Sequence, residues 1–494
     1  MVKAVVGEEI RLNSIEDRLS HSGLSSQVGL VIGKISTSLD RGFVFDLVPT
    51  PVNDAGEAAS WITESKDDAN KKRGGSKPKS QSDSSSVLSI DKDWVAEHAR
   101  QVSRMLVGGM KVVGIYIWMN ESLFKNSTLV LCQAVKGVAE AVPLVDFGWD
   151  ERLLIHISLS PRRWACRNCS LSSNITSSSL RPCDFKMGRV LSTLQKFKCI
   201  HNFDIRFPIF RENISSSRKF AEILRDVISN HAEELKAAKA LVDGEMVNVD
   251  ELLAFDGVHE VEFLLPFMQH TSFQAYNQEE VVGILVFTGS ICSFAYTNTK
   301  EPISQALADI KADIISSLHS RLDIICDEAD GQLDSGPDVS GDLVDETSTQ
   351  IPIPQLQLQS IRKQCSLTFP RRVFVPWLGD TYICDYIQPS ETLEVLRDHC
   401  VELMSMEAPT DKTVILEPET ESTSSVTFPT NSFWETAMSL SPELSQSSLN
   451  NKSSKRRSVA GTQILKSSNV SIITALLILI LSVIIGILLF AFRA

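Results

Sequence analysis

The chain has 494 residues, of which 43 % are hydrophobic and 22 % are charged. This length predicts two or three domains with a sizeable core, and the composition excludes a collagen-like or wholly disordered chain. Lys and Arg number 48 against 61 Asp and Glu, a net charge of −13, which argues against a nucleic-acid partner because phosphate contacts need clustered basic side chains. Ten cysteines are too few for a disulfide scaffold and are typical of a reducing compartment.

Strands and a helix follow one another near the N-terminus. Residues 28–35 are an apolar run and residues 42–48 alternate as GFVFDLV, which predicts two adjacent strands. Residues 93–106, DWVAEHARQVSRML, carry an apolar stripe at helical spacing, and two glycines at 108–109 end the predicted helix. Residues 111–118, KVVGIYIW, then predict a buried strand.

Further strands are predicted at 153–159 and 283–288, and a long helix at 301–326 opens with Pro302. Its apolar stripe consists of Ile303, Leu307, Ile310, Ile314, Leu318, Leu322 and Ile325. Interleaved strands and helices predict an α/β fold class, with α+β as the open alternative.

Four polar stretches divide the chain. They are a disordered insertion at 53–90, a Ser-rich loop at 167–180, an acidic linker at 327–355 and a Ser/Thr/Glu-rich disordered stalk at 406–469. Between them, residues 1–326 form the predicted main region, and residues 356–405 form the C-terminal part of the same soluble domain.

The segment from Val470 to Phe492 contains 23 residues and no charge. As a helix it would span roughly 34 Å, enough to cross a hydrocarbon core of about 30 Å. Basic residues lie upstream of it, at Lys452, Lys455, Arg456, Arg457 and Lys466. The positive-inside rule therefore predicts a single-pass tail anchor in a lipid bilayer, with the preceding residues in the cytosol. The N-terminus lacks the pattern of a signal peptide.

The best candidate metal ligands are cysteines and a histidine. Cys166 and Cys169 are separated by two residues, with Cys183, Cys199 and His201 downstream. A structural zinc site usually has two closely spaced ligand pairs. Here the residues that could form the second pair, Cys183, Cys199 and His201, are widely spaced along the chain. Ordinary thiols are therefore the favoured interpretation, and zinc stays an alternative.

His399 and Cys400 are adjacent within ETLEVLRDHCVELM. A cysteine protease needs its base near the thiol in space, which adjacency in sequence does not indicate. A helix-face histidine beside a buried thiol is therefore the preferred interpretation. The sequence also contains no GxxxxGK[ST], GxSxG or HExxH motif.

Residues 29–51, GLVIGKISTSLDRGFVFDLVPTP, followed by the helix at 93–106 and KVVGIYIW, resemble the opening of an MPN (JAMM-type) domain. Catalytic members bind zinc through an HxH-x7-SxxD pattern after such a strand. This register puts Ile117 and Met119 at the histidine positions, Ser127 at the serine and Val130 at the aspartate. The resemblance thus implies an MPN-like module with a degenerate metal site, no cofactor and no metallohydrolase activity, since Ile, Met and Val do not ligate Zn²⁺.

A narrower resemblance rests on residues 93–117, on PRRVFVPW at 370–377 and on CDYIQPSETLEVLRDH at 384–399. With a C-terminal apolar anchor, these segments resemble the odr-4 family over residues 1–405 and 470–492. The resemblance implies a non-enzymatic membrane protein of the endoplasmic reticulum. It also implies that the protein assists maturation or trafficking of client membrane proteins and binds the cysteine protease specific for the ubiquitin-fold modifier.

The leading hypothesis is therefore a membrane-anchored adaptor that concentrates a soluble partner at the membrane. A hydrolase with an unrecognised active site and a simple structural tether are the alternatives. The helices at 93–106 and 302–326 are candidate partner interfaces. The longer one is preferred, because its stripe around Ile314, Leu318 and Leu322 is longer than one small sheet usually covers. The alternative is that both stripes pack on their own sheets.

Overall fold

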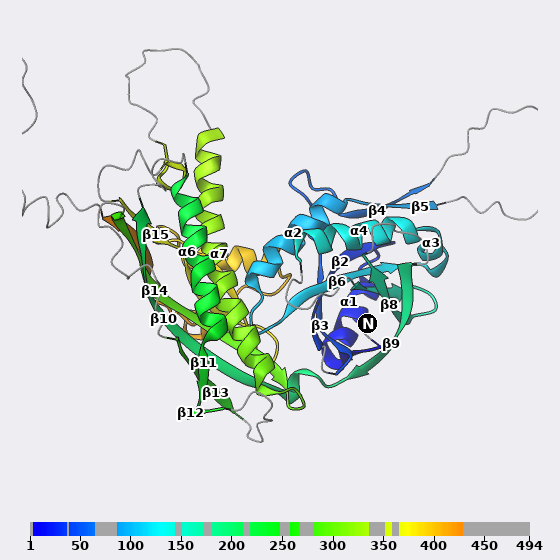
Figure 1. Cartoon of the computed structure of the whole chain (residues 1–494). Helices are drawn as coiled ribbons and strands as arrows, with labels where there is room; N and C mark the ends of the chain where they lie inside the picture. The colour runs from blue at the N-terminus through cyan, green and yellow to red at the C-terminus, as the bar shows by residue number, and fades with distance from the viewer. Residues whose placement is uncertain are drawn as a thin grey trace, which may run out of the picture. The chain divides into compact units, whose positions relative to one another are not determined.

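A computed structural model gives the fold (Figure 1). The structure describes residues 3–36, 39–64, 86–143, 151–171, 179–210, 218–247, 257–266, 281–334, 351–357 and 365–427. All of these lie in one unit, Met1–Pro429. Within these ranges no helix has the length and apolar character needed to cross a membrane. The membrane segment predicted from Val470 to Phe492 lies outside them.

The N-terminal half contains a closed barrel of seven strands. Around the barrel the order is β1 (Ala4–Glu8), β3 (Arg41–Pro49), β2 (Gln27–Ser36), β6 (Lys111–Met119), β7 (Glu151–Ser158), β8 (Arg163–Ser170) and β9 (Leu180–Gly188). Strand β1 closes it by pairing in parallel with both β3 and β9. The apolar runs that predicted strands at 28–35, 42–48 and 111–118 belong to β2, β3 and β6, which are buried along nearly their whole length.

Helices cover two sides of the barrel strands. One apolar cluster joins α1 (Glu9–His21) to barrel residues such as Tyr116. A second cluster joins the opposite strand faces to α2 (Lys92–Met105), α3 (Glu121–Asn126) and α4 (Thr128–Ala141). Asp91 caps α2 by accepting a hydrogen bond from Trp94 N at 3.0 Å, as an N-cap carboxylate typically does.

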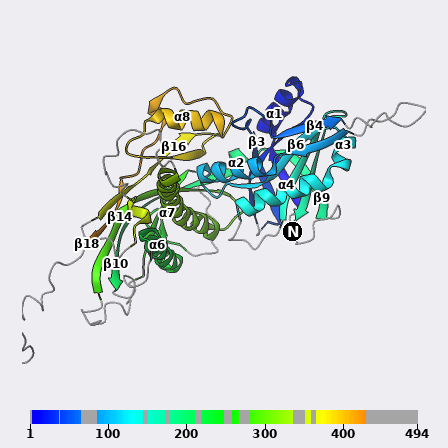
Figure 2. The same cartoon turned by 90° about the horizontal axis from the view of Figure 1, so that it is seen from above.

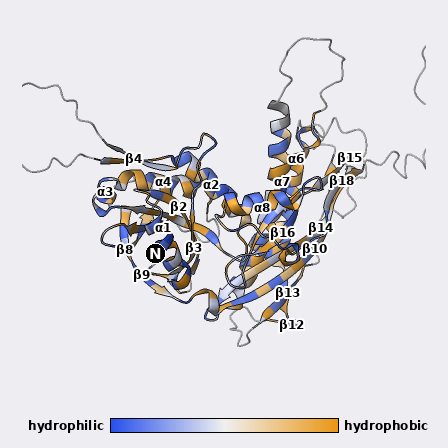
Figure 3. Cartoon of the chain, turned by 180° about the vertical axis from the view of Figure 1, so that it is seen from behind, coloured by the Kyte–Doolittle hydropathy of each residue, from blue (hydrophilic) through white to orange (hydrophobic). Residues whose placement is uncertain are grey.

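A second sheet of seven strands forms the other part of the unit. Its order is β12 (Glu245–Met246), β11 (Lys239–Val242), β13 (Val258–Leu264), β10 (Leu194–Phe210), β14 (Val281–Asn298), β18 (Ser422–Thr427) and β15 (Cys365–Phe369). Helices α6 (Phe220–Ala237) and α7 (Ile303–Asp334) lie side by side against it (Figures 1 and 2). Hydrophobic and hydrophilic residues alternate along the strands (Figure 3), as expected where only one face of a strand is buried.

A hairpin and a short helix connect the two sheets. Strands β16 (Arg371–Pro376) and β17 (Tyr382–Ile387) pair in antiparallel fashion and pack with α8 (Leu393–Glu402). Leu106, at the end of α2, forms a β-bridge with Ile383, and Gly108 forms one with Ala295 of β14. Gly108 has a φ of +73°, and a side chain there would collide with the Tyr296 ring. The glycine pair that ends α2 therefore also permits this close approach. The fold is mixed α/β, as predicted.

Several predicted segment boundaries are wrong. Residues 60–64 and 86–90 form β4 (Ser60–Glu64) and β5 (Ser86–Ile90), which pair with each other. The insertion predicted at 53–90 therefore contains ordered strands at both ends, and residues 65–85 lie outside the described ranges. The predicted loop at 167–180 overlaps β8 and β9, because their polar side chains alternate with buried ones and hide the strand pattern.

The predicted linker and stalk also begin too early. Helix α7 continues to Asp334, eight residues into the acidic stretch predicted to be a linker from residue 327. The predicted stalk at 406–469 contains β18, which pairs with β14 and β15. Glu419, just before β18, helps to hold this segment in place. Its side chain is 0 % exposed and accepts hydrogen bonds from Arg321 Nη2 at 2.5 Å and Arg372 N at 2.7 Å. The polar composition of residues 406–469 predicts disorder, but Glu419 in this segment belongs to a buried ionic network.

Candidate functional site

Two side chains of β6 occupy the positions where the MPN resemblance puts metal-binding histidines. Ile117 and Met119 are both 0 % exposed. They pack in one apolar cluster with Val95 and Val102 of α2 and with Leu131 of α4. Zn²⁺ takes imidazole, carboxylate or thiolate ligands, so these two positions cannot supply its ligands.

The other two positions of that pattern lie at the start of α4. Ser127 is the N-cap residue and is buried, and its backbone N–H donates to Leu123 O at 3.0 Å. Val130 is half-buried and packs against the same apolar cluster as Ile117 and Met119. One hydroxyl is thus the only polar side chain that these four positions provide.

One imidazole beside this cluster was missed in the sequence. His156 on β7 lies directly opposite Ile117 in the parallel β6–β7 ladder. Its Nε2 donates to Met119 O at 3.1 Å, and its ring stacks on Phe124 with centroids 4.1 Å apart. Burial lowers the pKa of His156, so the neutral ring serves as a packing group. Within the described ranges, no three His, Cys, Asp or Glu side chains form a group that could hold a metal.

Cys166 and Cys169, the closely spaced pair of the alternative zinc site, do not point to one place. Cys166 and Cys169 both lie on β8, but Cys166 joins the cluster that contains Tyr116, whereas Cys169 joins the one that contains Ile117. Residues three apart in a strand face opposite sides of the sheet. A shared ion would therefore have to lie on both sides of β8 at once.

Two further members of that candidate set lie in the second sheet. Cys199 and His201 are on β10, and His201 Nε2 is 3.0 Å from Nε2 of His231 on α6. Glu234 Oε2 is 3.2 Å from His231 Nδ1. Both imidazoles are buried, and this pair is separate from the thiols of β8.

His399 and Cys400 point to different surroundings on α8. His399 Nδ1 is 2.8 Å from Asp385 Oδ2, and this contact raises the pKa of His399. Cys400 is fully buried, and burial raises the pKa of its thiol to about 12. A thiol of that pKa is not a nucleophile at neutral pH, so the arrangement does not support a protease.

The predicted partner interface on the long helix is wrong. Ile314, Leu318 and Leu322 on α7 are fully buried and pack with Leu224 of α6 and Phe287 of β14. The stripe is longer than one small sheet usually covers. However, β10 and β14 contain 17 and 18 residues, and strands of this length can cover the whole stripe.

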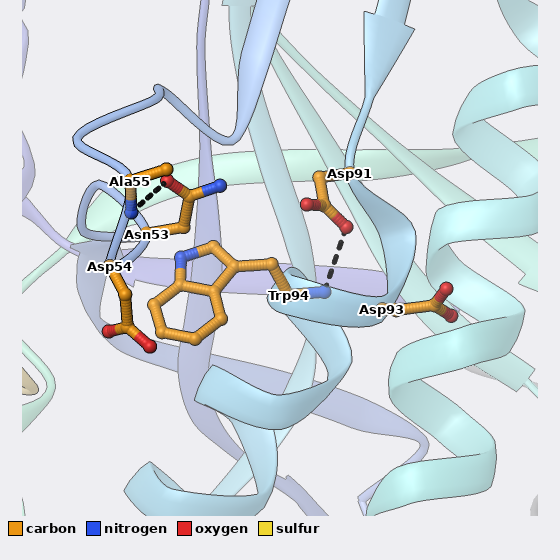
Figure 4. A pocket seen from close by; sticks show the side chains of 6 residues that line it. All are labelled: Asn53, Asp54, Ala55, Asp91, Asp93 and Trp94. Carbon is orange, nitrogen blue, oxygen red and sulfur yellow. Dashed lines mark hydrogen bonds between the residues drawn. The ribbon is translucent and has the colours of Figure 1, made fainter.

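A shallow pocket of about 490 Å³ lies at the N-terminus of α2. Figure 4 shows the Trp94 ring next to the loop of Asn53, Asp54 and Ala55, with Asp91 and Asp93 on the helix side. The indole N–H donates to Pro51 O at 2.9 Å. The pocket lining includes the carboxylates of Asp54, Asp91 and Asp93 and no Lys or Arg side chain.

Two exposed apolar side chains lie on the β4–β5 hairpin. Trp61 and Val87 are 48 % and 53 % exposed, whereas Leu88 faces the core. The hairpin adjoins the pocket, because Asp91 directly follows β5 and its N–H donates to Ala59 O at 3.0 Å. We call Trp61 and Val87, together with the acidic pocket, the hairpin surface.

A family model and several curated proteins match the sequence of this chain. The family model described as "ODR4-like: Odorant response abnormal 4-like" matches residues 29–415. The chain is 25 % identical to the Protein odr-4 homolog of Mus musculus over 340 residues, covering 64 % of this chain and 69 % of the mouse protein. It is 26 % identical to the Protein odr-4 homolog of Dictyostelium discoideum over 395 residues, covering 78 % of this chain and 76 % of that protein. Among solved structures, it is similar to the one titled "Crystal structure of UfSP from C.elegans", with 7 % identity, a TM-score of 0.34, and coverage of 82 % of this chain and 57 % of that chain.

Proposed function

Because this chain belongs to the ODR4-like family, we propose that it is a non-enzymatic adaptor anchored in the endoplasmic reticulum membrane. In this proposal it binds the cysteine protease specific for the ubiquitin-fold modifier and assists maturation and trafficking of membrane proteins. The observation that carries the non-enzymatic part is the apolar packing at Ile117 and Met119. The protease and the membrane clients follow from the properties that the odr-4 resemblance implies.

The proposal treats the barrel and its helices as an MPN-like module that has lost its metal site. Its support is the succession of β2, β3, α2 and β6, which follows the order of the sequence resemblance. A fold without its catalytic ligands still presents surfaces to partners. The module therefore acts by binding in this proposal.

The charge-free segment at 470–492 is the proposed membrane anchor. A tether of this kind raises the effective concentration of a bound partner near the membrane, to about millimolar for a short flexible linker. Recruitment thus needs no chemistry by the adaptor.

The hairpin surface is the proposed contact for the soluble partner. Tryptophan is enriched among the residues that dominate binding energy at interfaces, and Trp61 is half-exposed. The adjoining carboxylates of Asp54, Asp91 and Asp93 favour a partner segment that combines apolar with Lys or Arg side chains.

Co-purification of the protease with the full chain from solubilised membranes tests the proposal. We expect capture by the wild-type chain and loss of capture by Val87→Glu. The matched control is Val258→Glu, because Val258 is also a strand valine and is 54 % exposed. Loss of capture in both variants would exclude the hairpin surface as the contact, and no capture by the wild-type chain would contradict the adaptor function.

The alternative enzymatic function has its own test. The purified full chain should neither cleave modifier conjugates nor contain stoichiometric zinc. Cleavage that survives removal of the co-purified protease would show that the chain is an enzyme.

A further inference from the structure

Two thiols face each other across adjacent strands of the barrel. Cys166 on β8 is the direct register partner of Cys183 on β9, and the two side chains are hydrogen-bonded. Directly opposed residues in an antiparallel pair have Cα atoms about 4.5–5.5 Å apart. This lies inside the range of about 4.4–6.8 Å found in disulfides. The strands therefore already hold the two cysteines at bonding range.

The two thiols differ in access and acidity. Cys166 is buried within the barrel cluster, whereas Cys183 is half-buried and reachable from solvent. The hydrogen bond from Cys166 lowers the pKa of Cys183, while the same contact and burial raise that of Cys166. The thiolate is the nucleophile in disulfide exchange. Cys183 is thus suited to react first, and Cys166 to resolve.

We propose that Cys166 and Cys183 are a reversible oxidation site that forms a disulfide in the folded protein when it meets a low-molecular-weight disulfide such as glutathione disulfide. The Cys183 thiolate attacks one glutathione sulfur and releases one glutathione thiolate. Once Cys183 is in the mixed disulfide, it no longer accepts the hydrogen bond that raises the pKa of Cys166. Cys166 then loses its proton to solvent, attacks Cys183 Sγ, forms the protein disulfide and displaces the second glutathione. The two protein thiols lose two protons and two electrons, which glutathione disulfide gains.

The site is independent of the proposed adaptor function, and it has a structural consequence. Strand β9 also pairs with β1, which closes the barrel. A β8–β9 disulfide would link two strands next to this closure and restrict the unfolded chain more than the native one. Oxidation should therefore raise the melting temperature of the barrel.

Another cysteine pair and one single cysteine provide internal controls. Cys132 on α4 and Cys169 on β8 are also hydrogen-bonded to each other, but both are fully buried, so glutathione disulfide cannot reach them. Cys365 is half-buried on β15 in the second sheet. It should react by retaining one glutathione.

The experiment exposes the purified full chain to glutathione disulfide under native conditions, followed by alkylation of free thiols and peptide mapping without reductant. We expect a crosslink between the β8 and β9 peptides, no glutathione on either cysteine, and free thiols at Cys132 and Cys169. Dithiothreitol should restore both thiols and reverse the rise in melting temperature.

Single substitutions test the order of attack. In Cys166→Ser, Cys183 should keep one glutathione because the resolving thiol is absent. In Cys183→Ser, Cys166 should stay reduced, and Cys132→Ser should leave the crosslink intact. Glutathione retained on Cys183 of the wild-type chain, or equal oxidation of Cys132 and Cys169, would overturn the proposal. A thermal melt of each variant confirms that it is folded.

Discussion

Lys34 of β2 donates a hydrogen bond to Asp309 of α7 at 2.5 Å, and each side chain is only 4 % exposed. The ammonium also donates to Tyr296 O at 2.9 Å. This pair joins the barrel to the helix that covers the second sheet. Gly109, with a φ of +80°, leaves the space beside the Asp309 carboxylate that any Cβ would fill.

Replacing one member of the Lys34–Asp309 pair should strongly destabilise the protein. Lys34→Met leaves the Asp309 carboxylate buried without its counter-ion, which costs about 3–5 kcal/mol of the free energy of unfolding. The double variant Lys34→Met with Asp309→Leu should recover most of that loss, because neither charge is then buried alone. Urea unfolding of the full chain in detergent measures both. Equal losses in the single and double variants would show that the ionic contact itself is not what matters.

Placing a histidine at Ile117, where the MPN resemblance puts a metal ligand, should destabilise the protein. Ile117→His removes a buried branched side chain and buries a polar ring, a change of about 2–4 kcal/mol in unfolding free energy. Ile117→Val is the control and should cost about 0.5–1.5 kcal/mol. Melting curves together with metal analysis check the outcome. Zinc bound to the histidine variant at wild-type stability would overturn the packing argument.

Local patterns predicted the barrel strands better than the second sheet. The strands β2, β3 and β6 and the helix α2 are recognisable because their apolar residues follow one another along the chain. Strand β18 was not predicted, since its pairing with β14 links residues more than 130 positions apart. No local pattern in the Ser/Thr-rich segment reveals such a partner.

The candidate site, too, is only partly predictable from local sequence patterns. The MPN resemblance puts Ile117 and Met119 at the two histidine positions. Because both side chains are apolar, the sequence alone predicts that these positions do not bind a metal. The neighbouring His156 depends on the parallel β6–β7 ladder, which periodicity alone does not indicate. From the sequence alone, the long apolar stripe on α7 favours a partner interface, because the polar stretches that interrupt the chain hide the length of β10 and β14.

The stripe on α7 is core, so a charge there should unfold the protein. Leu318→Ala leaves a cavity among α6, α7 and β14 and should cost about 2–5 kcal/mol; Leu318→Glu should prevent folding, since an unpaired carboxylate would be buried. The control is Glu328→Gln at an exposed position of the same helix. A folded Leu318→Glu variant that loses only partner binding would restore the interface interpretation.

The proposed topology gives a separate prediction. Protease added to intact microsomes should remove the residues before position 470 from the proposed anchor, because the positive-inside rule predicts that the side with the basic flank is cytosolic. Three of the sequons in the chain, at Asn126, Asn174 and Asn213, should carry no glycan. Protection of the soluble part, or a glycan at any of the three, would reverse the orientation.

The His201–His231 contact predicts loss of stability in acid. Desolvation by burial, and next the neighbouring His231, lower the pKa of His201 to about 4, whereas an unfolded histidine titrates near 6.5. Below pH 6.5, His201 therefore binds a proton in the unfolded chain but not in the folded chain. The stabilising contribution is complete above pH 6.5 and is lost as the pH falls toward 4, by up to about 1.4 kcal/mol per pH unit for one such group.

The variant His201→Gln keeps a hydrogen-bonding side chain but removes this titration, so its unfolding free energy should fall less steeply between pH 6.5 and 4. His399→Gln is the matched control. Its contact with Asp385 raises the pKa of His399, so its contribution is complete below pH 6.5 and is lost only as the pH rises through that higher pKa. Replacing His399 should therefore leave the acid slope unchanged. Urea unfolding at several pH values measures the slopes, and identical slopes for His201→Gln and wild type would show that His201 is protonated in the folded protein.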